Sequence, residues 1–223
     1  RGDVMEKSII LSDFDGTITT QDVGVEVVKN FGPSNWKEIE QKYIAGELSS
    51  KETQSLYYEN LKISTAELIE YIKENIEIDP YFKEFYDYCQ QQEQQLYILS
   101  DGMDFYIDLL LAEYNLAEID FYCNSYQDQG GEVKTKYPYF NPQCGKCGHC
   151  KSNTLAKLHN GEFIIYIGDG YTDRCPVNKA DLVFAKDQLA EFCDSNNIKY
   201  LSYQNFADVL EKISEHPLFG LGL

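Results

Sequence analysis

The sequence is poor in basic residues and in long apolar runs. Lysine and arginine together number 19 against 37 aspartates and glutamates, which gives a net charge of -18. Such an excess of negative charge disfavours nucleic acids and anionic membranes as partners, because both attract basic surfaces. No apolar run approaches the roughly 18–20 residues that a membrane-spanning helix needs. We therefore expect a protein that binds neither nucleic acid nor membrane.

Arginine is the scarcest of the charged residues, since Arg1 and Arg174 are the only two in the chain. An arginine is the side chain that best grips a carboxylate with two parallel hydrogen bonds. The segment 17–77 contains none, and lysine is a poor geometric replacement. A substrate carboxylate would therefore find no such clamp there.

The first seven residues contain no apolar stretch of the secretory kind. The chain has seven cysteines, an odd number, and three of them lie between positions 144 and 150. This pattern suits a reduced protein with a local thiol cluster better than a disulfide framework. We expect a cytoplasmic protein that is a monomer or a homodimer.

Two aspartates one residue apart follow the first apolar run of the chain. Residues 9–20 read IILSDFDGTITT, which predicts a buried strand that ends just before Asp13 and Asp15. Open α/β sheets bind ligands at the carboxyl ends of their strands, and residues two apart on an extended chain point the same way. Gly16 lets the backbone approach a ligand closely, and Thr17 offers a hydroxyl. Both carboxylates are thus expected to reach one substrate.

Further polar residues follow two later apolar runs and open one amphipathic segment. They are Ser100 and Gly102 after LYIL, Lys151 at the start of the amphipathic segment, and Asp169 and Asp173 after FIIYI. An aspartate pair, a serine, a lysine and a second acidic pair in this order resemble the haloacid dehalogenase superfamily of phosphohydrolases. The resemblance extends over nearly the whole chain.

Alternation of strands and helices after residue 78 predicts an α/β fold with a doubly wound, Rossmann-like parallel sheet. We expect this core to comprise residues 1–16 and 78–215, with an inserted helical cap at 17–77 and a tail at 216–223. Ser49 with Glu52, and Ser64 with Glu67, look like capping boxes inside that cap. The run 121–139, with two glycines at its middle, predicts a small β-hairpin flap. Asp79 and Pro80 predict the start of a helix, and another helix is expected near 173–179. The histidines at 149, 159 and 216 are expected to be surface or capping residues.

The resemblance implies a role for each of these residues. Asp13 is the nucleophile that carries the phosphoryl group, and Asp15 is the general acid and base. Mg²⁺ is held by Asp13, Asp169 and the carbonyl of Asp15. Ser100, Lys151 and backbone amides near Gly102 hold the phosphoryl oxygens. The remaining expected contacts to the substrate side are Thr17, Asp22 and Asp173, the last of which orients Lys151 or a metal-bound water.

An aspartate at position 15 resembles the phosphatase and phosphomutase branch of the superfamily. Within it the segments DFDGTIT, CGKCGHCK and YIGDGYTD resemble the methionine-salvage phosphatases, whose substrate is the enol-phosphate 2-hydroxy-3-keto-5-methylthiopentenyl-1-phosphate. We therefore expect a Mg²⁺-dependent phosphomonoesterase that acts on a small phosphorylated metabolite through an aspartyl-phosphate. Phosphocholine, phosphoethanolamine and phosphoserine stay open as substrates. A phosphomutase also stays open, as does a non-catalytic relative that binds a phosphorylated metabolite.

Three cysteines at a spacing of three residues directly precede Lys151. They are Cys144, Cys147 and Cys150. Thiolates at this spacing suit a structural Zn²⁺ site that stiffens the loop before the lysine. The cysteines could equally be reduced thiols in a glycine-rich loop, because the sequence identifies no fourth ligand.

Overall fold

One seven-stranded sheet forms the centre of the computed structural model, which describes residues 7–216. Its strands are β1 (Ser8–Ser12), β2 (Gln95–Met103), β3 (Phe121–Asp128), β4 (Val133–Lys136), β5 (Phe163–Gly168), β6 (Leu182–Ala185) and β7 (Leu201–Ser202). They lie in the order β4-β3-β2-β1-β5-β6-β7, and all neighbours are parallel except β3 and β4. The predicted doubly wound α/β fold is confirmed.

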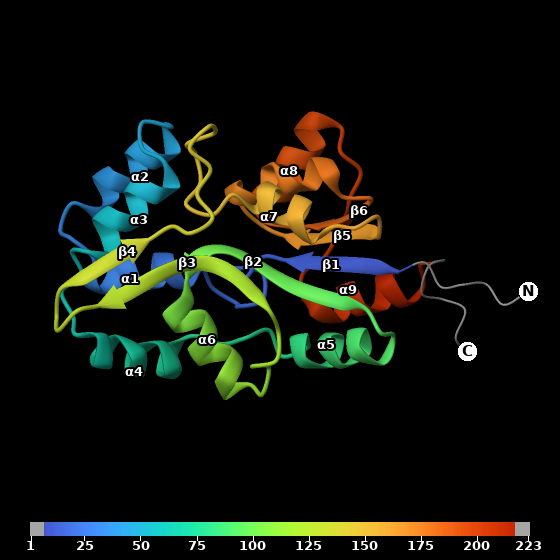
Figure 1. Ribbon diagram of the computed structural model, residues 1–223, viewed down its shortest axis with the longest axis horizontal. Coiled ribbons are helices and arrows are strands. Elements are labelled where there is room, and N and C mark those ends of the chain that lie inside the picture. The colour runs from blue at the N-terminus through green and yellow to red at the C-terminus, as the bar shows by residue number, and fades with distance from the viewer. Residues whose placement is uncertain (1–6, 217–223) are drawn as a thin grey trace, which may run out of the picture.

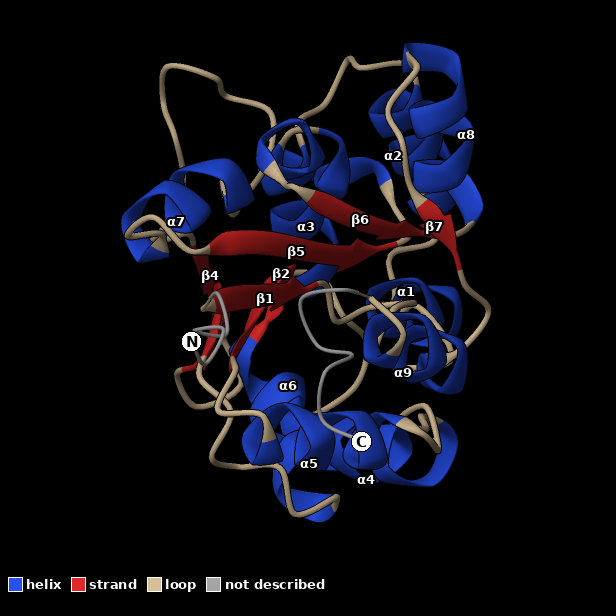
Figure 2. Ribbon diagram, turned by 90° about the vertical axis from the view of Figure 1, so that its right-hand side faces the viewer, coloured by secondary structure: helices blue, strands red, loops and turns tan. Residues whose placement is uncertain are grey.

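Helices cover both faces of the sheet (Figures 1 and 2). The covering helices are α5 (Phe82–Gln91), α6 (Asp104–Glu113) and α9 (Phe206–Ser214) on one face, and α7 (Lys151–Leu158) and α8 (Asp187–Asn196) on the other. A single helix near 173–179 was expected from the sequence. The structure has two short 3₁₀ turns instead, η1 (Tyr171–Arg174) and η2 (Pro176–Lys179). Pro176 accounts for the break, because a proline supplies no backbone N–H to continue a helix.

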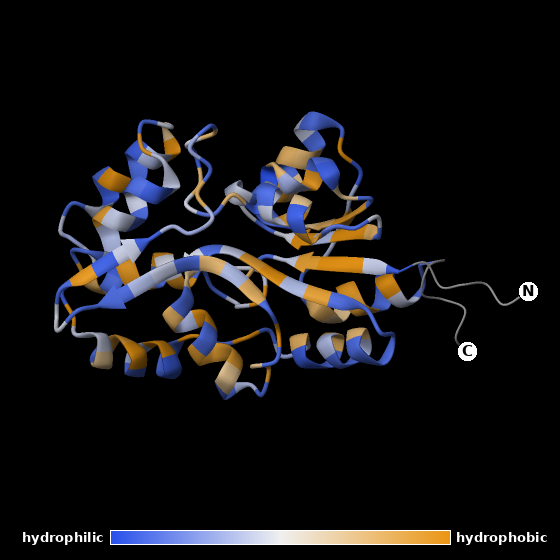
Figure 3. Ribbon diagram, viewed as in Figure 1, coloured by the Kyte–Doolittle hydropathy of each residue, from blue (hydrophilic) through white to orange (hydrophobic). Residues whose placement is uncertain are grey.

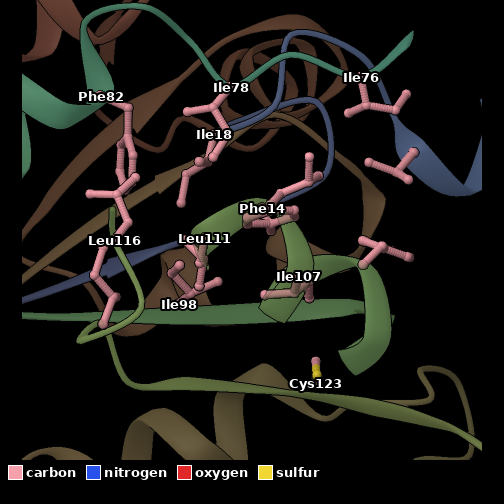
Figure 4. Close-up of a cluster of buried hydrophobic side chains, with 14 of the residues drawn as sticks. Phe14, Ile18, Ile76, Ile78, Phe82, Ile98, Ile107, Leu111, Leu116 and Cys123 are labelled. Atoms are coloured by element: carbon pink, nitrogen blue, oxygen red, sulfur yellow. The ribbon is translucent and has the colours of Figure 1, made fainter. Parts of the chain in front are cut away.

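The apolar strand β1 faces both layers of helices. Ile9 and Leu11 belong to the core cluster under α7 and α8, whereas Ile10 belongs to the cluster under α5, α6 and α9. All three side chains are fully buried. This explains why β1 reads as a continuous apolar run, as strands covered on both faces do. Figure 3 shows the apolar colour along β1. Figure 4 shows Phe14 packed among residues of the cluster under α5, α6 and α9.

Four helices lie between β1 and α5. They are α1 (Val23–Phe31), α2 (Trp36–Ile44), α3 (Ser50–Tyr58) and α4 (Thr65–Asn75). Both predicted capping boxes are present. At the start of α3 the side chains of Ser49 and Glu52 each accept a hydrogen bond from the other residue's backbone N–H. Ser64 and Glu67 do the same at the start of α4.

Two linker segments, at 18–20 and at 77–79, connect this helical segment to the rest of the fold, and they lie side by side. Thr19 and Ile78 form an antiparallel bridge, Thr20 N donates to Glu77 O at 2.9 Å, and Asp79 N donates to Ile18 O at 2.8 Å. One hydrophobic core cluster contains buried residues of these helices, of both linkers and of the sheet. The division into a core and a cap at 17–77 stays a prediction, and the predicted tail lies outside the described residues after position 216.

The predicted β-hairpin is confirmed as β3 and β4. Gly130 and Gly131 make its turn with φ of +78° and +96°, backbone values that favour glycine. The hairpin reaches the cap, because Ser55 on α3 lies 3.0 Å from the Thr135 hydroxyl and 2.8 Å from the Tyr137 hydroxyl. The flap therefore holds α3 over the end of the sheet.

One capping expectation was wrong. Asp79 and Pro80 were expected to open a helix, but α5 begins at Phe82. The Asp79 carboxylate instead accepts hydrogen bonds from the N–H of Tyr81 at 2.9 Å and of Phe206 at 3.1 Å. It thus joins the start of α5 to the start of α9. Among residues 7–216, no helix is long and apolar enough to cross a membrane.

The capping box of α4 gives a stability test. Replacing Ser64 by alanine removes the acceptor of the Glu67 N–H, so we expect the free energy of unfolding to fall by about 1 kcal/mol. Urea denaturation measures this change. Ser34→Ala, at an exposed turn position, is the control and should stay within about 0.5 kcal/mol of the parent protein. Equal effects of the two changes would contradict the assigned cap.

Candidate active site

The carboxyl ends of β1 and β5 lie next to each other at the middle of the sheet. From β1 the chain continues to β2 on one side, and from β5 it continues to β6 on the other. Connections that leave two adjacent strands in opposite directions open a crevice at their ends. Asp13 and Asp15 follow β1 at this point, and Asp169 follows β5.

Asp13 is fixed by its backbone and by its side chain. Its N–H donates to the carbonyl of Ile167 at 2.9 Å, which extends the pairing of β1 with β5. Its Oδ1 accepts from the N–H of Phe14 at 2.7 Å and lies 2.8 Å from Nζ of Lys151. Oδ2 accepts no hydrogen bond from the described residues. This oxygen is the one left for a ligand.

Lys151 is buried between two aspartates. Its Nζ lies 2.8 Å from Asp13 and 2.7 Å from Asp173, and its side chain is fully buried. Burial would lower the pKa of Lys151, but the two carboxylates outweigh it and raise that pKa above its ordinary value. Burial likewise raises the pKa of Asp13, the charge of Asp173 raises it further, and Lys151 opposes both. The lysine is therefore the cation that makes two buried negative charges tolerable.

Asp173 has donors on both of its carboxylate oxygens. Lys151 and the hydroxyl of Tyr166 lie 2.7 Å and 2.6 Å from Oδ1, and the N–H groups of Asp169 and Gly170 donate to Oδ2 at 3.2 Å and 3.0 Å. Burial raises its pKa, but Lys151 outweighs this and lowers it below the ordinary value. Asp173 is thus placed to orient Lys151. It is not among the described residues that line the pocket at the ends of β1 and β5.

Asp15 points into the pocket with one oxygen bonded and one without a partner. Its Oδ2 accepts from Ser100 Oγ at 3.0 Å and from the hydroxyl of Tyr106 at 2.9 Å, while Oδ1 is buried without a hydrogen-bond partner. Burial raises the pKa of Asp15 to about 7, helped by the negative charge of Asp22. A carboxyl group with that pKa holds or releases a proton near neutral pH.

Gly16 allows the two strand ends to approach. Its φ is +74°, and a Cβ built there would lie 2.7 Å from Oδ2 of Asp169. Thr17 is buried, and its hydroxyl donates to Oδ1 of Asp169 at 2.7 Å. The hydroxyl of Thr17 thus orients Asp169, and the expected contact of Thr17 with the substrate stays a prediction.

The remaining predicted residues lie around the same space. Ser100 is buried, and its Oγ accepts from Gly102 N at 2.8 Å. Gly102 lines the pocket, where a Cβ would lie 2.5 Å from Oδ2 of Asp15. Asp22 caps α1 by accepting from Val25 N at 2.8 Å and also lines the pocket. The structure therefore brings these separate segments to one cleft.

The side chains at this cleft fit a hard divalent cation. The carboxylates of Asp13, Asp169 and Asp173 have one oxygen each within 4.8 Å of one another. Burial and the charge of Asp173 raise the pKa of Asp169 to about 7, so an added cation would relieve the site's excess of negative charge. Oxygen ligands of this kind are those that Mg²⁺ prefers. Because the oxygens of Asp173 already have donors, Asp13 and Asp169 are the better ligands.

The cysteine loop does not supply a matching zinc site. Cys144 is exposed, Cys147 and Cys150 are partly exposed, and all are free thiols. Within the described part of the chain, the only group of three or more histidine, cysteine, aspartate or glutamate side chains with all ligand atoms within 4.8 Å is the aspartate group above. The predicted Zn²⁺ site is therefore unsupported, because the loop does not bring the three thiols that close.

Two residues that support the site, Tyr106 and His149, were not identified as such from the sequence. Tyr106 donates to Asp15, but nothing in its local pattern distinguishes it from an apolar helix residue. His149 is fully buried, with ring nitrogens 2.8 Å from Ser100 O and 2.7 Å from Thr154 Oγ1. The sequence suggested a surface or capping residue at this position, whereas the structure buries it. Its place two residues before Lys151 is the signal that could have indicated a supporting role.

Comparison with known proteins agrees with this geometry. Residues 8–195 match the family model described as Putative Phosphatase. A 2-hydroxy-3-keto-5-methylthiopentenyl-1-phosphate phosphatase from Bacillus mycoides (strain KBAB4) is 36% identical over 208 residues, which cover 92% of this chain and 94% of that protein. The corresponding protein of Bacillus pumilus (strain SAFR-032) is 34% identical, with 92% and 90% covered.

Solved structures share the fold at low identity. A phosphoserine phosphatase solved as a phospho-aspartyl intermediate analogue has a TM-score of 0.69 at 19% identity, with 93% of this chain and 99% of that chain covered. A HAD family hydrolase from Salmonella enterica subsp. enterica serovar Typhi has a TM-score of 0.71 at 20% identity, with 91% and 69% covered. The chain belongs to the Putative Phosphatase family, shares its fold with the HAD family hydrolase, and is a phosphatase.

Gly16 gives a test of how tightly the strand ends approach. Gly16→Ala places a methyl group against Asp169 on left-handed backbone, so we expect a loss of phosphatase activity and of more than about 1–2 kcal/mol of stability. Gly46 is the matched control, because it has φ of +75° with no atom within 4 Å of a built Cβ. Gly46→Ala should lose about 1–2 kcal/mol and keep its activity. Equal activity in the two variants would contradict the close approach.

His149 makes stability depend on pH. Burial lowers the pKa of His149 from 6.5 to about 4, so between these values the unfolded chain binds a proton that the folded chain does not. The contribution of His149 is complete above about pH 6.5 and is lost as the pH falls toward 4. Between about pH 7 and 4.5 the parent protein should lose about 2–3 kcal/mol more than His149→Gln does. The buried aspartates titrate in both proteins and cancel in the difference. Urea denaturation at several pH values measures it, and a constant difference would refute the assignment.

Proposed function

We propose that the protein is a Mg²⁺-dependent phosphomonoesterase that hydrolyses a small phosphorylated metabolite through an aspartyl-phosphate on Asp13. One observation carries the proposal: Asp13, Asp15, Lys151 and Asp169 come from three separate segments and meet at the ends of β1 and β5, with Nζ of Lys151 2.8 Å from Asp13. Phosphoryl transfer needs mainly positioning and neutralisation of charge, which this group of side chains is suited to provide.

In the first step a carboxylate oxygen of Asp13 attacks phosphorus and the ester P–O bond breaks. Asp15 gives its proton to the leaving alkoxide, a role that its pKa of about 7 supports. In the second step Asp15 takes a proton from water, whose oxygen attacks phosphorus and displaces the Asp13 carboxylate. The products are the alcohol and inorganic phosphate, and both aspartates return to their starting state.

The supporting residues hold the reacting groups in place. Lys151 stabilises negative charge beside Asp13, and Asp173 keeps the lysine there. Ser100 and Tyr106 orient Asp15, and Thr17 orients Asp169. Asp13, Asp169 and the carbonyl of Asp15 would hold Mg²⁺, which when bound lowers the repulsion between the nucleophile and the phosphate.

The identity of the metabolite is the finer part of the proposal. The names of the relatives point to the methionine-salvage enol-phosphate as one candidate. The acidic residues that line the pocket favour a second, the phosphate esters of amino alcohols such as phosphocholine and phosphoethanolamine. Phosphoserine fits less well, because no lysine or arginine is among the described residues of the pocket to meet its carboxylate. We further propose a cytoplasmic monomer or homodimer.

Hydrolysis of p-nitrophenyl phosphate tests the site. We expect phosphate release with Mg²⁺, none after EDTA, and restoration when Mg²⁺ returns. Asp13→Asn should retain less than about a thousandth of the rate, because the amide is a far weaker nucleophile. Asp87→Asn is the control, since Asp87 is a half-exposed residue of an ion pair on α5, and its rate should match that of the parent protein. Full activity in Asp13→Asn, or with EDTA, would refute the site.

A further inference from the structure

The position of Lys151 depends on the loop that precedes it. Lys151 is the first residue of α7, and its Nζ lies 2.8 Å from Asp13. The loop at 144–150, which leads into α7, contains neither helix nor strand. A misplacement of a reacting group by about 1 Å can cost roughly a hundredfold in rate. Whatever fixes this loop therefore also fixes the cation beside Asp13.

Asp101, near the end of β2, holds the loop from the side of the sheet. Its Oδ1 accepts hydrogen bonds from His149 N at 2.6 Å and from Asn124 Nδ2 at 3.0 Å, and its Oδ2 accepts from the hydroxyl of Ser50. The residue is 8% exposed. Donors from three separate segments thus meet at one buried carboxylate. Hydrogen bonds to a charged group are roughly twice as strong as those between neutral groups.

Ser50, the first residue of α3, holds the same loop from the helical segment. Its backbone N–H donates to the carbonyl of Lys146 at 2.9 Å. Its hydroxyl oxygen accepts from Gly148 N at 3.3 Å while the hydroxyl donates to Asp101. Ser50 is buried. One serine therefore binds the loop at two backbone positions, and the carboxylate that it contacts binds the loop at a third.

Gly148 shows how closely the loop packs against these groups. A Cβ built there would lie 2.9 Å from Oδ1 of Asp101, 2.9 Å from Nδ2 of Asn124 and 2.8 Å from the ring of Tyr137. Non-bonded carbon contacts are most favourable at about 3.5–4.0 Å, so a side chain at this position would push the loop away from β2. The glycine keeps the backbone of the loop within reach of Asp101.

The thiols of the loop do not perform this task. Its three cysteines are free. The hydrogen bond from Cys150 N to Tyr139 O at 3.0 Å is local, because both residues belong to the connection between β4 and α7. The contacts of Asp101 and Ser50 instead join the loop to β2 and α3, which are distant in the sequence.

We propose that Asp101 is a positioning residue for Lys151: together with Ser50 it holds the loop at 144–150, and the loop sets where the ammonium group meets Asp13. The inference rests on the role proposed above for Lys151, which is to stabilise negative charge beside Asp13. Because each oxygen of Asp101 already has a donor from the protein, Asp101 acts by accepting hydrogen bonds and not by offering its charge to the substrate. Its shape and its hydrogen-bonding atoms therefore matter more than its charge.

Two substitutions at position 101 separate hydrogen bonding from charge. Asp101→Asn keeps an acceptor oxygen for the N–H of His149, and its amide can donate to the oxygen of Ser50. We expect its kcat for p-nitrophenyl phosphate to stay within about fivefold of the parent value, whereas Asp101→Ala should lose roughly 10–100-fold. Asp108→Ala is the control, because it removes a carboxylate from an exposed residue of α6 that does not line the pocket, and its kcat should match that of the parent. Equal losses in Asp101→Asn and Asp101→Ala would overturn the proposal, because the two variants share only the loss of charge.

A double-mutant cycle tests whether Asp101 acts through Lys151. Asp101→Ala should change the residual kcat of Lys151→Met by less than about twofold, because the lysine that Asp101 positions is then missing. The same fold-loss with and without the lysine would show that Asp101 acts independently of it, and would overturn the proposal. Circular dichroism confirms that each variant is folded. The comparison of Asp101→Asn with Asp101→Ala decides alone if Lys151→Met is too slow to measure.

Ser50→Ala protects the test against a poorly folded Asp101→Ala. It removes the hydroxyl that contacts Asp101 and Gly148 but keeps the carboxylate and the backbone contact with Lys146. We expect kcat to fall by roughly three- to tenfold. A parent-like kcat in this variant would contradict the proposed hold on the loop.

The outcomes separate the two proposals. Hydrolysis of p-nitrophenyl phosphate by the parent protein, with unchanged kcat in both Asp101→Ala and Ser50→Ala, would overturn the positioning role and leave the phosphatase standing. Absence of phosphate release from the parent protein with Mg²⁺ would instead overturn the proposed function.

Discussion

A buried lysine between two buried aspartates is the interaction on which the site depends. Each charge of the group Asp13, Lys151 and Asp173 would be costly in the interior alone, and together they compensate one another. Asp173 is in turn held by Tyr166 and by two backbone amides after β5. The position of Asp13 is therefore set by a chain of contacts that begins in the sheet.

The strand ends and the helical segment between β1 and α5 both line the pocket. Asp13, Asp15 and Asp169 follow the ends of β1 and β5, and Lys151 at the start of α7 lies beside Asp13. The helical segment between β1 and α5 adds Asp22, Glu40 and tyrosines of α2 and α3 to the lining of the same pocket. Asp101 connects the two parts, because it contacts Ser50 of α3 and the backbone of His149 in the loop before Lys151. Residues far apart in the sequence therefore line one pocket.

The sequence predicted the parts of this arrangement that depend on local pattern. The apolar runs before Asp13 and Asp169, the capping boxes of α3 and α4 and the hairpin at Gly130 are all encoded within a few residues. The contacts that depend on tertiary packing were not predictable in this way. Thr17 could equally have faced a phosphate or Asp169, and only the pairing of β1 with β5 decides between them.

The same limit applies to Asp79, which has the pattern of a helix cap but joins two helices far apart in sequence. His149 and Tyr106 have no local signal, because their partners lie across the fold. Spacing alone suggested a metal site for the three cysteines, and the loop geometry does not support it.

The stereochemical course at phosphorus tests the central claim most directly. A phosphorothioate monoester made chiral with two oxygen isotopes, hydrolysed in water that carries the third, yields a chiral thiophosphate whose configuration reports each in-line displacement as an inversion. Transfer to Asp13 followed by attack of water comprises two displacements, so the account predicts net retention of configuration. Net inversion would show that water attacks the ester in a single step, and it would contradict a phosphorylated Asp13.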